Sequence, residues 1–466
     1  MKILALCDSP TLETGFSRVA KNLFKVWHKR GVEIDCWGIG FNGWGYRGVD
    51  TVKTIYPAGM GGEWHREDRM ELFLHQLANG GYTHVWIMQD TFLLSATDFP
   101  IVLRRVCAEK GIRSMLYFPV DAPLDPAWTD IIAAVDAPVA YTAYGGNEAR
   151  RAARARSEWL WEKKVETPLN YDFEPVVLPH GVDFSIYRPM AERKTFRHML
   201  YAKKEWLLDD DFFMLNVNMN QCRKDPPRSL EILAGLRARG IPAKLALHMP
   251  ESGGPEQQIS LEQVANQLGL KTGCWGHHGM LFRNGQGILP EAGDPAVKES
   301  IGLVHFYNAA DLYLTTTKGE GWGLGITEAL ACGLPVAVPY HTGCMDIMEK
   351  LCSPGVGYDD MVVLLDPEAG ANVDRADNSR MRHRVDLAKA VEAIAKYYES
   401  GKWQNRQSLA ENKELKEWLS WDRIGWEMLR LLKTPPLPAK PIPEKPTEAK
   451  GCDVQFGGVE KCGSPN

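Results

Sequence analysis

A stretch between residues 318 and 339, KGEGWGLGITEALACGLPVAVP, places two glutamates on either side of a glycine-rich turn. Glycine lets a backbone bend tightly and approach a ligand closely. A short helix is expected to begin near Gly325 and to stop at Gly333. Glu320 then lies in the loop and Glu328 in the first helical turn, so the two carboxylates flank a helix N-terminus, which attracts anions.

This arrangement fits a phosphate group with hydroxyls beside it. The helix N-terminus can bind the phosphate, and a carboxylate on each side can accept hydrogen bonds from hydroxyl groups. A phosphate flanked by hydroxyls describes a sugar nucleotide. Each glutamate taken alone has an ordinary explanation, as a residue that favours the helix dipole or as a solvated loop residue. The whole stretch together favours the ligand.

Strand and helix signals alternate in two successive series, which predict the elements that carry this site. The first series covers residues 1–183, and the second runs from FFMLNVN, residues 212–218, to ADLYLTTT, residues 310–317. Such alternation indicates parallel βαβ units. We expect an α/β protein with two Rossmann-like domains facing across a cleft, and ligands at the carboxyl ends of the strands.

The expected domain boundaries follow from these two series. The N-terminal domain covers residues 1–186, the C-terminal domain covers 187–413, and a terminal helix covers 414–433. The tail, residues 434–466, is rich in Pro, Lys and Glu and has few apolar residues to bury. We therefore expect the tail to be disordered.

Composition excludes several classes of function. The net charge is -5 over 466 residues, so no global basic field exists for non-specific nucleic-acid binding. No apolar run is long enough to span a bilayer, and the start, MKILALCDSP, is too short for a signal-peptide core. We expect a cytoplasmic protein without an integral membrane segment.

Three patterns that could suggest a metal or a dinucleotide are weak. Cys274 lies close to two histidines but lacks a second ligand pair at zinc spacing. GWGYRG, residues 43–48, is a literal G-x-G-x-x-G, but the segment after it is expected to be extended rather than helical. Asp209 and Asp211 precede a strand in a connecting segment. We therefore expect neither a required metal nor a cofactor.

The stretch EGWGLGITEALACGLPVAV closely resembles the E-x7-E signature of the retaining family-4 glycosyltransferases, which have the GT-B fold. TGFSRVAKNL is similar to the family's first glycine loop, VLPHGVDFSIYRP to its strand end before the interdomain crossing, and SWDRIGWEMLRLL to the terminal helix that crosses back. TGFSRVAKNL and NQCRKD also look like glycosyltransferases common in phage and bacterial genomes. The resemblance implies a metal-independent hexosyltransferase that moves a sugar from a nucleotide diphosphate sugar to a hydroxyl acceptor with retention.

The resemblance also implies roles for single residues. Glu320 would hydrogen-bond hydroxyls of the donor sugar near the reacting carbon, and Glu328 would hold the nucleotide ribose. Backbone N–H groups from both domains would meet the diphosphate: Gly323, Leu324 and Gly325 on one side, Gly15 and Phe16 on the other.

A basic segment, NVNMNQCRKDPPRSLEIL at residues 216–233, is similar to the family's diphosphate clamp. A cation near the leaving phosphate stabilises the negative charge that builds there in the transition state. Lys224 matches the family's lysine, whereas Met219 stands where the family has an arginine. Arg223 is expected to substitute, because a guanidinium can bind phosphate bidentately. The ordinary alternative is a solvated loop before a helix.

The acceptor half of such a fold is less well defined by the sequence. Asp121 resembles the position where many relatives carry a histidine near the acceptor; it could orient an acceptor hydroxyl, or cap the next helix or turn. His180 is expected to be structural or to lie at the cleft edge. A basic stretch at residues 148–164 could contact an acidic acceptor, or be an ordinary solvated helix face, through Arg150, Arg151, Arg154 and Arg156.

The acceptor itself is open among a glycan, a protein, a lipid and a modified DNA with a hydroxymethylated base. Two other functions also fit the sequence. One is a sugar-nucleotide epimerase on the same fold, and the other is a non-catalytic sugar-nucleotide-binding protein, to which Met219 gives some weight. The intact set of Glu320, Glu328 and Lys224 favours the transferase.

Overall fold

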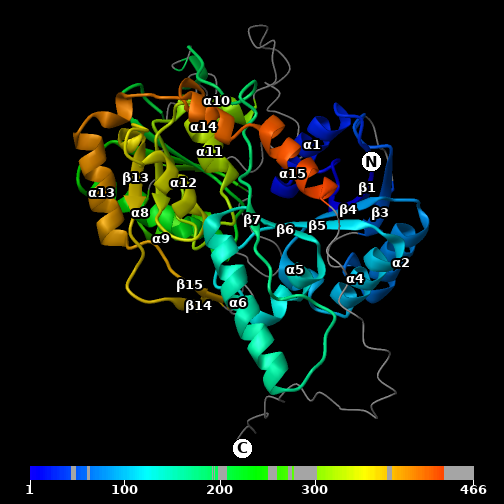
Figure 1. Ribbon diagram of the computed structural model, residues 1–466. Coiled ribbons are helices and arrows are strands. Elements are labelled where there is room, and N and C mark those ends of the chain that lie inside the picture. The colour runs from blue at the N-terminus through cyan, green and yellow to red at the C-terminus, as the bar shows by residue number, and fades with distance from the viewer. Residues whose placement is uncertain are drawn as a thin grey trace, which may run out of the picture.

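Two domains lie side by side in the computed structural model (Figure 1). The structure describes residues 1–43, 49–59, 63–191, 193, 195–197, 207–249, 260–270, 275–277, 302–374 and 380–434. Three expectations fall wholly or mainly outside these residues: GWGYRG beyond Gly43, the pattern around Cys274, and the tail beyond Thr434.

The N-terminal domain is built on a seven-stranded parallel sheet of order β3-β2-β1-β4-β5-β6-β7. Its strands are β1 (Lys2–Asp8), β2 (Glu33–Ile39), β3 (Thr54–Gly59), β4 (His84–Met88), β5 (Arg113–Phe118), β6 (Ala137–Ala140) and β7 (Val176–Val177). Its helices are α1 (Gly15–His28), α2 (Glu67–Asn79), α3 (Thr91–Leu94), α4 (Phe99–Lys110), α5 (Asp130–Ala134) and α6 (Ala143–Glu162). The central strands are apolar throughout because helices cover both faces of a parallel sheet.

The C-terminal domain repeats this plan with a six-stranded parallel sheet of order β10-β9-β8-β11-β12-β13. Its strands are β8 (Phe212–Val217), β9 (Ala243–His248), β10 (Trp275–His277), β11 (Leu312–Leu314), β12 (Val336–Pro339) and β13 (Val362–Leu365). Its helices are α8 (Pro226–Ala238), α9 (Leu261–Gln267), α10 (Leu303–Ala309), α11 (Leu324–Ala331), α12 (Gly343–Leu351), α13 (Leu387–Glu399) and α14 (Lys413–Trp418). An antiparallel pair, β14 (Asn372–Asp374) and β15 (Arg380–Arg382), follows β13.

Strand order reverses once in each sheet, between β1 and β4 and between β8 and β11. In open α/β sheets, ligands bind outside the carboxyl ends of the strands at such reversals. The two α/β domains expected from the alternating pattern are therefore confirmed. In each sheet, one of the predicted motifs follows a strand beside the reversal point.

Two strands are shorter than their apolar sequences suggested. ADLYLTTT forms a strand only over Leu312–Leu314, and PVVLPHGVD only over Val176–Val177. The three threonines after Leu314 are buried, and Thr316 donates a hydrogen bond to the carbonyl of Asp225. These residues are buried inside the domain, although they do not belong to the sheet.

The chain crosses between the domains twice. Val182, after the N-terminal sheet, pairs with Ser420, which caps α15 (Trp421–Lys433). Helix α15 then packs on α1, and the indole N–H of Trp27 donates to the carbonyl of Gly425 at 2.9 Å. Figure 1 shows α15, in orange-red, lying beside the dark blue α1. The expected return of the terminal helix is confirmed.

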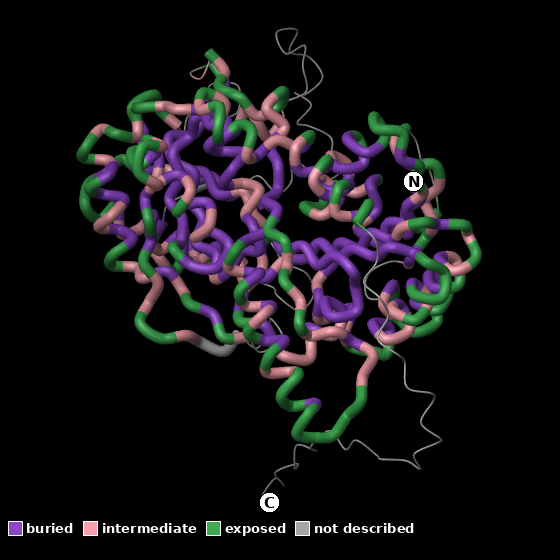
Figure 2. Tube along the Cα trace, in the orientation of Figure 1, coloured by how far each residue is buried: buried purple, intermediate pink, exposed green. Residues whose placement is uncertain are grey.

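Burial is continuous across the two domains. Figure 2 shows buried backbone running through both sheets and through the region where they meet. One hydrophobic cluster contains residues of both domains, including Trp27, Tyr141, Trp322 and Trp421. The domains also share a polar contact, because the Asp346 carboxylate accepts the N–H groups of Ala143 and Tyr144 at the start of α6.

Gly425 sets the distance between α15 and α1. A β-carbon at this position would lie 2.6 Å from a methyl of Val26. Overpacking of this kind costs about 1–3 kcal/mol, so Gly425→Val should lower the thermal midpoint. Trp426→Ala, at the neighbouring position whose side chain is 49% exposed, is the control and should change stability by under about 0.5 kcal/mol. Equal midpoints for the two variants would contradict this packing role.

Candidate active site

The glycine-rich loop follows β11 and leads into α11. Gly323 has a φ of +97°, in the left-handed region that favours glycine, and it is the N-cap of the helix. The helix begins at Leu324, close to the expected start, and Glu328 lies just beyond its first turn. At Gly325 a β-carbon would lie 2.5 Å from the hydroxyl of Tyr313, so this residue allows the helix to pack on β11.

Lys224 and Glu320 form an ion pair at the carboxyl ends of β8 and β11. Arg223 lies beside them, 3.8 Å from a carboxylate oxygen of Glu320, and donates to the carbonyl of Gly319 at 3.0 Å. Burial, and then the neighbouring Arg223, lowers the pKa of Lys224, while the charge of Glu320 opposes that shift. The structure thus brings together three of the residues that the sequence singled out, whereas Met219 is 53% exposed.

Glu328 is buried and reaches across the domain boundary. Its carboxylate pairs with Arg18 of α1 at 2.7 Å and accepts the hydroxyl of Tyr307 at 3.0 Å. The charge of Glu328 raises the pKa of Arg18, although burial opposes this. Sequence reasoning missed Arg18, which lies inside the quoted segment TGFSRVAKNL one turn after Gly15.

The starts of α1 and α11 approach each other from the two domains. Gly15 is the first residue of α1, and a β-carbon there would lie 3.7 Å from a methyl of Leu324, the first residue of α11. The first N–H groups of a helix lack partners within the helix. Two helix N-termini that point toward the same region favour an anion between the domains.

Asp121 lies where three arginines converge. Arg380 is 2.8 Å, Arg382 3.2 Å and Arg223 3.4 Å from its carboxylate oxygens. Burial alone would raise the pKa of Asp121, but these arginines outweigh it and lower the pKa to about 2. The capping alternative is excluded, since the cap of the following turn is Asp125, whose carboxylate accepts the N–H of Ala127.

Two more carboxylates end strands on the same side of the N-terminal sheet. Asp8 is the last residue of β1 and accepts the hydroxyl of Thr14 at 2.5 Å. Asp90 follows β4, and burial together with the charge of Asp121 raises its pKa to about 6. Neither residue was singled out from the sequence, because a lone aspartate after a strand is also a common turn residue.

His180 is part of the core. Its Nδ1 lies 2.8 Å from the hydroxyl of Tyr117, and its ring packs against those of Tyr141 and Trp322. Burial lowers the pKa of His180 to about 3, so the ring is neutral near pH 7. Of the two alternatives, the structural one is correct.

Three of the four arginines predicted in the basic stretch on α6 are paired with carboxylates. Arg150 pairs with Glu174, Arg151 with Glu148, and Arg156 with Asp130. Each pair lies on the surface of α6 or against the neighbouring segments. This pattern favours an ordinary charged helix face over a surface for an acidic ligand.

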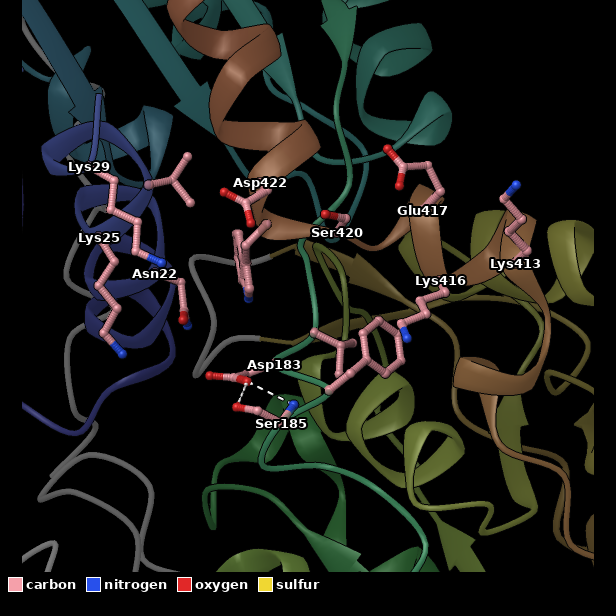
Figure 3. A pocket seen from close by; sticks show the side chains of 14 residues that line it. Asn22, Lys25, Lys29, Asp183, Ser185, Lys413, Lys416, Glu417, Ser420 and Asp422 are labelled. Atoms are coloured by element: carbon pink, nitrogen blue, oxygen red, sulfur yellow. Dashed lines mark hydrogen bonds between the residues drawn. The ribbon is translucent and has the colours of Figure 1, made fainter. Parts of the chain in front are cut away.

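A pocket of about 520 Å³ lies elsewhere, where the chain crosses between the domains (Figure 3). Figure 3 shows lysines of α1 and α14 around it, with Asp183 held by Ser185. None of the residues predicted for the site lines this pocket. The chemistry-bearing residues instead gather at the strand ends described above.

Comparison with known proteins gives the fold first. The sucrose-phosphate synthase of Thermosynechococcus elongatus is similar over 92% of this chain and 98% of its own, with a TM-score of 0.61 and 15% identity. The α,α-trehalose-phosphate synthase (UDP-forming) of Burkholderia vietnamiensis is similar over 93% and 100%, with a TM-score of 0.59 and 10% identity. The two facing domains, with the site between their strand ends, define the GT-B class of protein.

The sequence comparison adds the family resemblance. No protein-family model matches the chain. The D-inositol 3-phosphate glycosyltransferase of Salinispora arenicola (strain CNS-205) is 26% identical over 234 residues, which is 47% of this chain and 48% of that protein. The chain thus spans about half the length of this curated relative. The predicted resemblance to retaining family-4 glycosyltransferases of the GT-B fold is confirmed.

The comparisons do not support the finer resemblance to phage enzymes. Among the described residues, no helix is both long and apolar enough to cross a membrane.

Asp90 should make stability depend on pH. Its folded pKa is about 6, against about 3.9 for an unfolded aspartate. The folded state therefore binds the proton more tightly, and stability falls as pH rises from about 4 to about 6. Asp90→Asn removes this loss and should gain about 1–2 kcal/mol over the wild type at pH 8, and little at pH 4.

Thermal denaturation at both pH values measures this difference. Asp210→Asn, in an exposed turn before β8, is the control. A gain for Asp90→Asn that is the same at pH 4 and pH 8 would refute the assignment.

Proposed function

We propose that this protein is a glycosyltransferase that moves a sugar from a nucleoside diphosphate sugar to a hydroxyl acceptor. The observation that carries the proposal is the meeting of the Lys224–Glu320 pair with the starts of α1 and α11 at the domain boundary. Two helix N-termini and a buried cation suit a diphosphate. The carboxylates beside them suit the hydroxyls of a sugar and a ribose.

The residues then take complementary roles. The N-terminal residues of α1, Gly15 and Phe16, and those of α11, from Gly323 to Gly325, contact the diphosphate through N–H groups. Lys224, helped by Arg223, stabilises the charge that develops on the leaving phosphate. Glu320 positions the donor sugar. Retention of configuration comes from the family resemblance alone.

Glu328 is proposed to hold the ribose while it remains paired with Arg18 and Tyr307. Each carboxylate oxygen has two lone pairs, so a carboxylate with one partner on each oxygen can still accept hydroxyl hydrogen bonds. The contact with Arg18 fixes its position relative to α1. In this proposal, the nucleoside end of the donor lies beside α11 and the sugar end beside Glu320 and Lys224.

The acceptor is proposed to approach from the N-terminal domain, where Asp121 and Asp90 end their strands. The acceptor classes to screen are a glycan, a protein, a lipid and a DNA with a hydroxymethylated base. The ion pairs of Arg150, Arg151 and Arg156 weigh against an acidic acceptor bound along α6.

Nucleotide binding is the first test of this proposal. The thermal midpoint is measured with UDP, GDP, ADP, CMP, NAD and their sugar conjugates. A ligand at ~100 times its dissociation constant adds about 2.7 kcal/mol of stability. One diphosphate nucleotide should raise the midpoint of the wild type, and Glu328→Ala should lose that shift.

Arg18→Ala is the matched control for Glu328→Ala. It removes the same interdomain ion pair but leaves the carboxylate in place. The nucleotide shift should therefore persist in Arg18→Ala. Loss of the shift in both variants would mean that Glu328 acts by holding the domains together, and no shift with any nucleotide would reject the donor site.

Lys224→Ala tests the chemical step. Removing one group that stabilises transition-state charge costs about 10²–10³ in turnover. The variant keeps both helix N-termini, so it should keep a nucleotide-induced thermal shift, although a smaller one than the wild type. Lys396→Ala, on the exposed face of α13, is the control and should keep full turnover. Wild-type turnover in Lys224→Ala would rule out the clamp.

Product analysis in the same assay separates the other functions. An epimerase would need no acceptor and would leave the nucleotide attached to the sugar. A binding protein would show the thermal shift without transfer or hydrolysis.

A further inference from the structure

Three arginines alternate along β15 and the residues after it, and two of them reach out of the C-terminal domain. Arg380 and Arg382 belong to β15, and Arg384 follows it. Residues two apart in a strand point to the same side. The residues between them, Met381 and His383, are exposed, so the arginine side of the strand is the one that faces the protein.

Arg380 and Arg382 contact the N-terminal domain. Arg380 donates to the Asp121 carboxylate at 2.8 Å, and its guanidinium lies 4.4 Å from the ring centre of Trp128. The side chain of Arg382 is 1% exposed and donates both to the carbonyl of Asp121 at 2.6 Å and to its carboxylate at 3.2 Å. A planar guanidinium presents its donors in a fixed fork that suits such paired contacts, whereas the ammonium of a lysine has no such fork.

Arg384 holds the donor side of the same strand. It makes two hydrogen bonds to the Asp225 carboxylate, at 2.7 and 3.1 Å. Asp225 directly follows Lys224 and has a φ of +46°, a left-handed conformation that costs energy for a residue other than glycine. One strand therefore connects the turn that carries Lys224 with the loop that carries Asp121.

The donor loop and the loop that carries Asp121 are in direct contact. A β-carbon on Gly319 would overlap both the carbonyl of Asp121 and the guanidinium of Arg382. A β-carbon on Gly321 would lie 2.7 Å from Pro119, two residues before Asp121. The acceptor-side loop, Pro119–Asp121, is thus seated directly on the donor loop that carries Glu320.

We propose that Arg380 and Arg382 are positioning residues that hold the loop Pro119–Asp121 against the donor loop and so set the acceptor half of the site. This assignment rests on the proposed transfer reaction for its kinetic consequence, but not for its structural one. The two arginines also compensate the charge of Asp121, so Arg223 is shared between Asp121 and the Lys224–Glu320 pair rather than held by Asp121 alone.

The structural test is small-angle X-ray scattering of the full chain without ligand. The double variant R380A/R382A should have a larger radius of gyration than the wild type, because the contact between the two loops is lost. R239A/K396A is the matched control, since it removes two cations from the exposed Glu392 within the C-terminal domain. An unchanged radius of gyration in R380A/R382A would overturn the proposal.

The kinetic test uses the donor and acceptor that the screens above identify. R380A/R382A should raise the acceptor KM by about tenfold or more and change the donor KM less, because Lys224 and Glu320 keep their own ion pair. A fall in kcat with both KM values unchanged would overturn the positioning role. If no transfer is found with any acceptor, the proposed function fails while the scattering test still stands.

A second variant guards against loss of folding. If R380A/R382A does not fold, R382Q is studied with Asp121→Asn and the combined variant. Residues in direct contact should show non-additive changes of the thermal midpoint. Additive changes would show that Arg382 does not act through Asp121 and would overturn the proposal.

Discussion

At the domain boundary, two loops lie so close together that neither Gly319 nor Gly321 has room for a β-carbon. Pro119–Asp121 of one domain lies against Gly319 and Gly321 of the other. The loop with Gly319 and Gly321 follows β11 at the reversal point of its sheet, and Pro119–Asp121 follows β5, one strand beyond the reversal point of the other sheet. Gly343 belongs to the same constraint, because a β-carbon there would lie 2.6 Å from the carbonyls of Glu320 and Gly321. The glycines in this part of the chain thus allow the two loops to pack against each other, and they also allow a ligand to approach.

Charge pairing follows from that close contact. Residues that come together at the boundary lose water, and a buried charge without a partner is costly. Accordingly, Lys224 pairs with Glu320, Arg18 with Glu328, and the arginines of β15 with Asp121. An anionic ligand must therefore compete with Glu320 for Lys224, so the affinity of the site depends on how easily that pair rearranges.

The sequence predicted those residues of the candidate site that can be recognised from their neighbours in the chain. Glu320 lies in the loop after a strand-type segment, where ligands bind to parallel sheets, whereas Lys224 was predicted from the family resemblance. Glu328 was predicted from the start of a helix. Arg18 and Asp90 were missed, because the partner that gives each its significance lies far away in the chain. The arginines of β15 were missed too, although their alternation in RMRHR is visible, since nothing local indicates which domain they face.

The return of α15 to α1 has a consequence for the order in which the protein is made. Domains generally fold from the N-terminus as the chain emerges from the ribosome. The apolar side of α1 that receives Gly425 and its neighbours cannot be covered until the whole C-terminal domain has been synthesised. Until then, the N-terminal domain exposes an apolar helix face that its own residues do not cover. Synthesis of α15, rather than completion of the N-terminal domain, closes the surface.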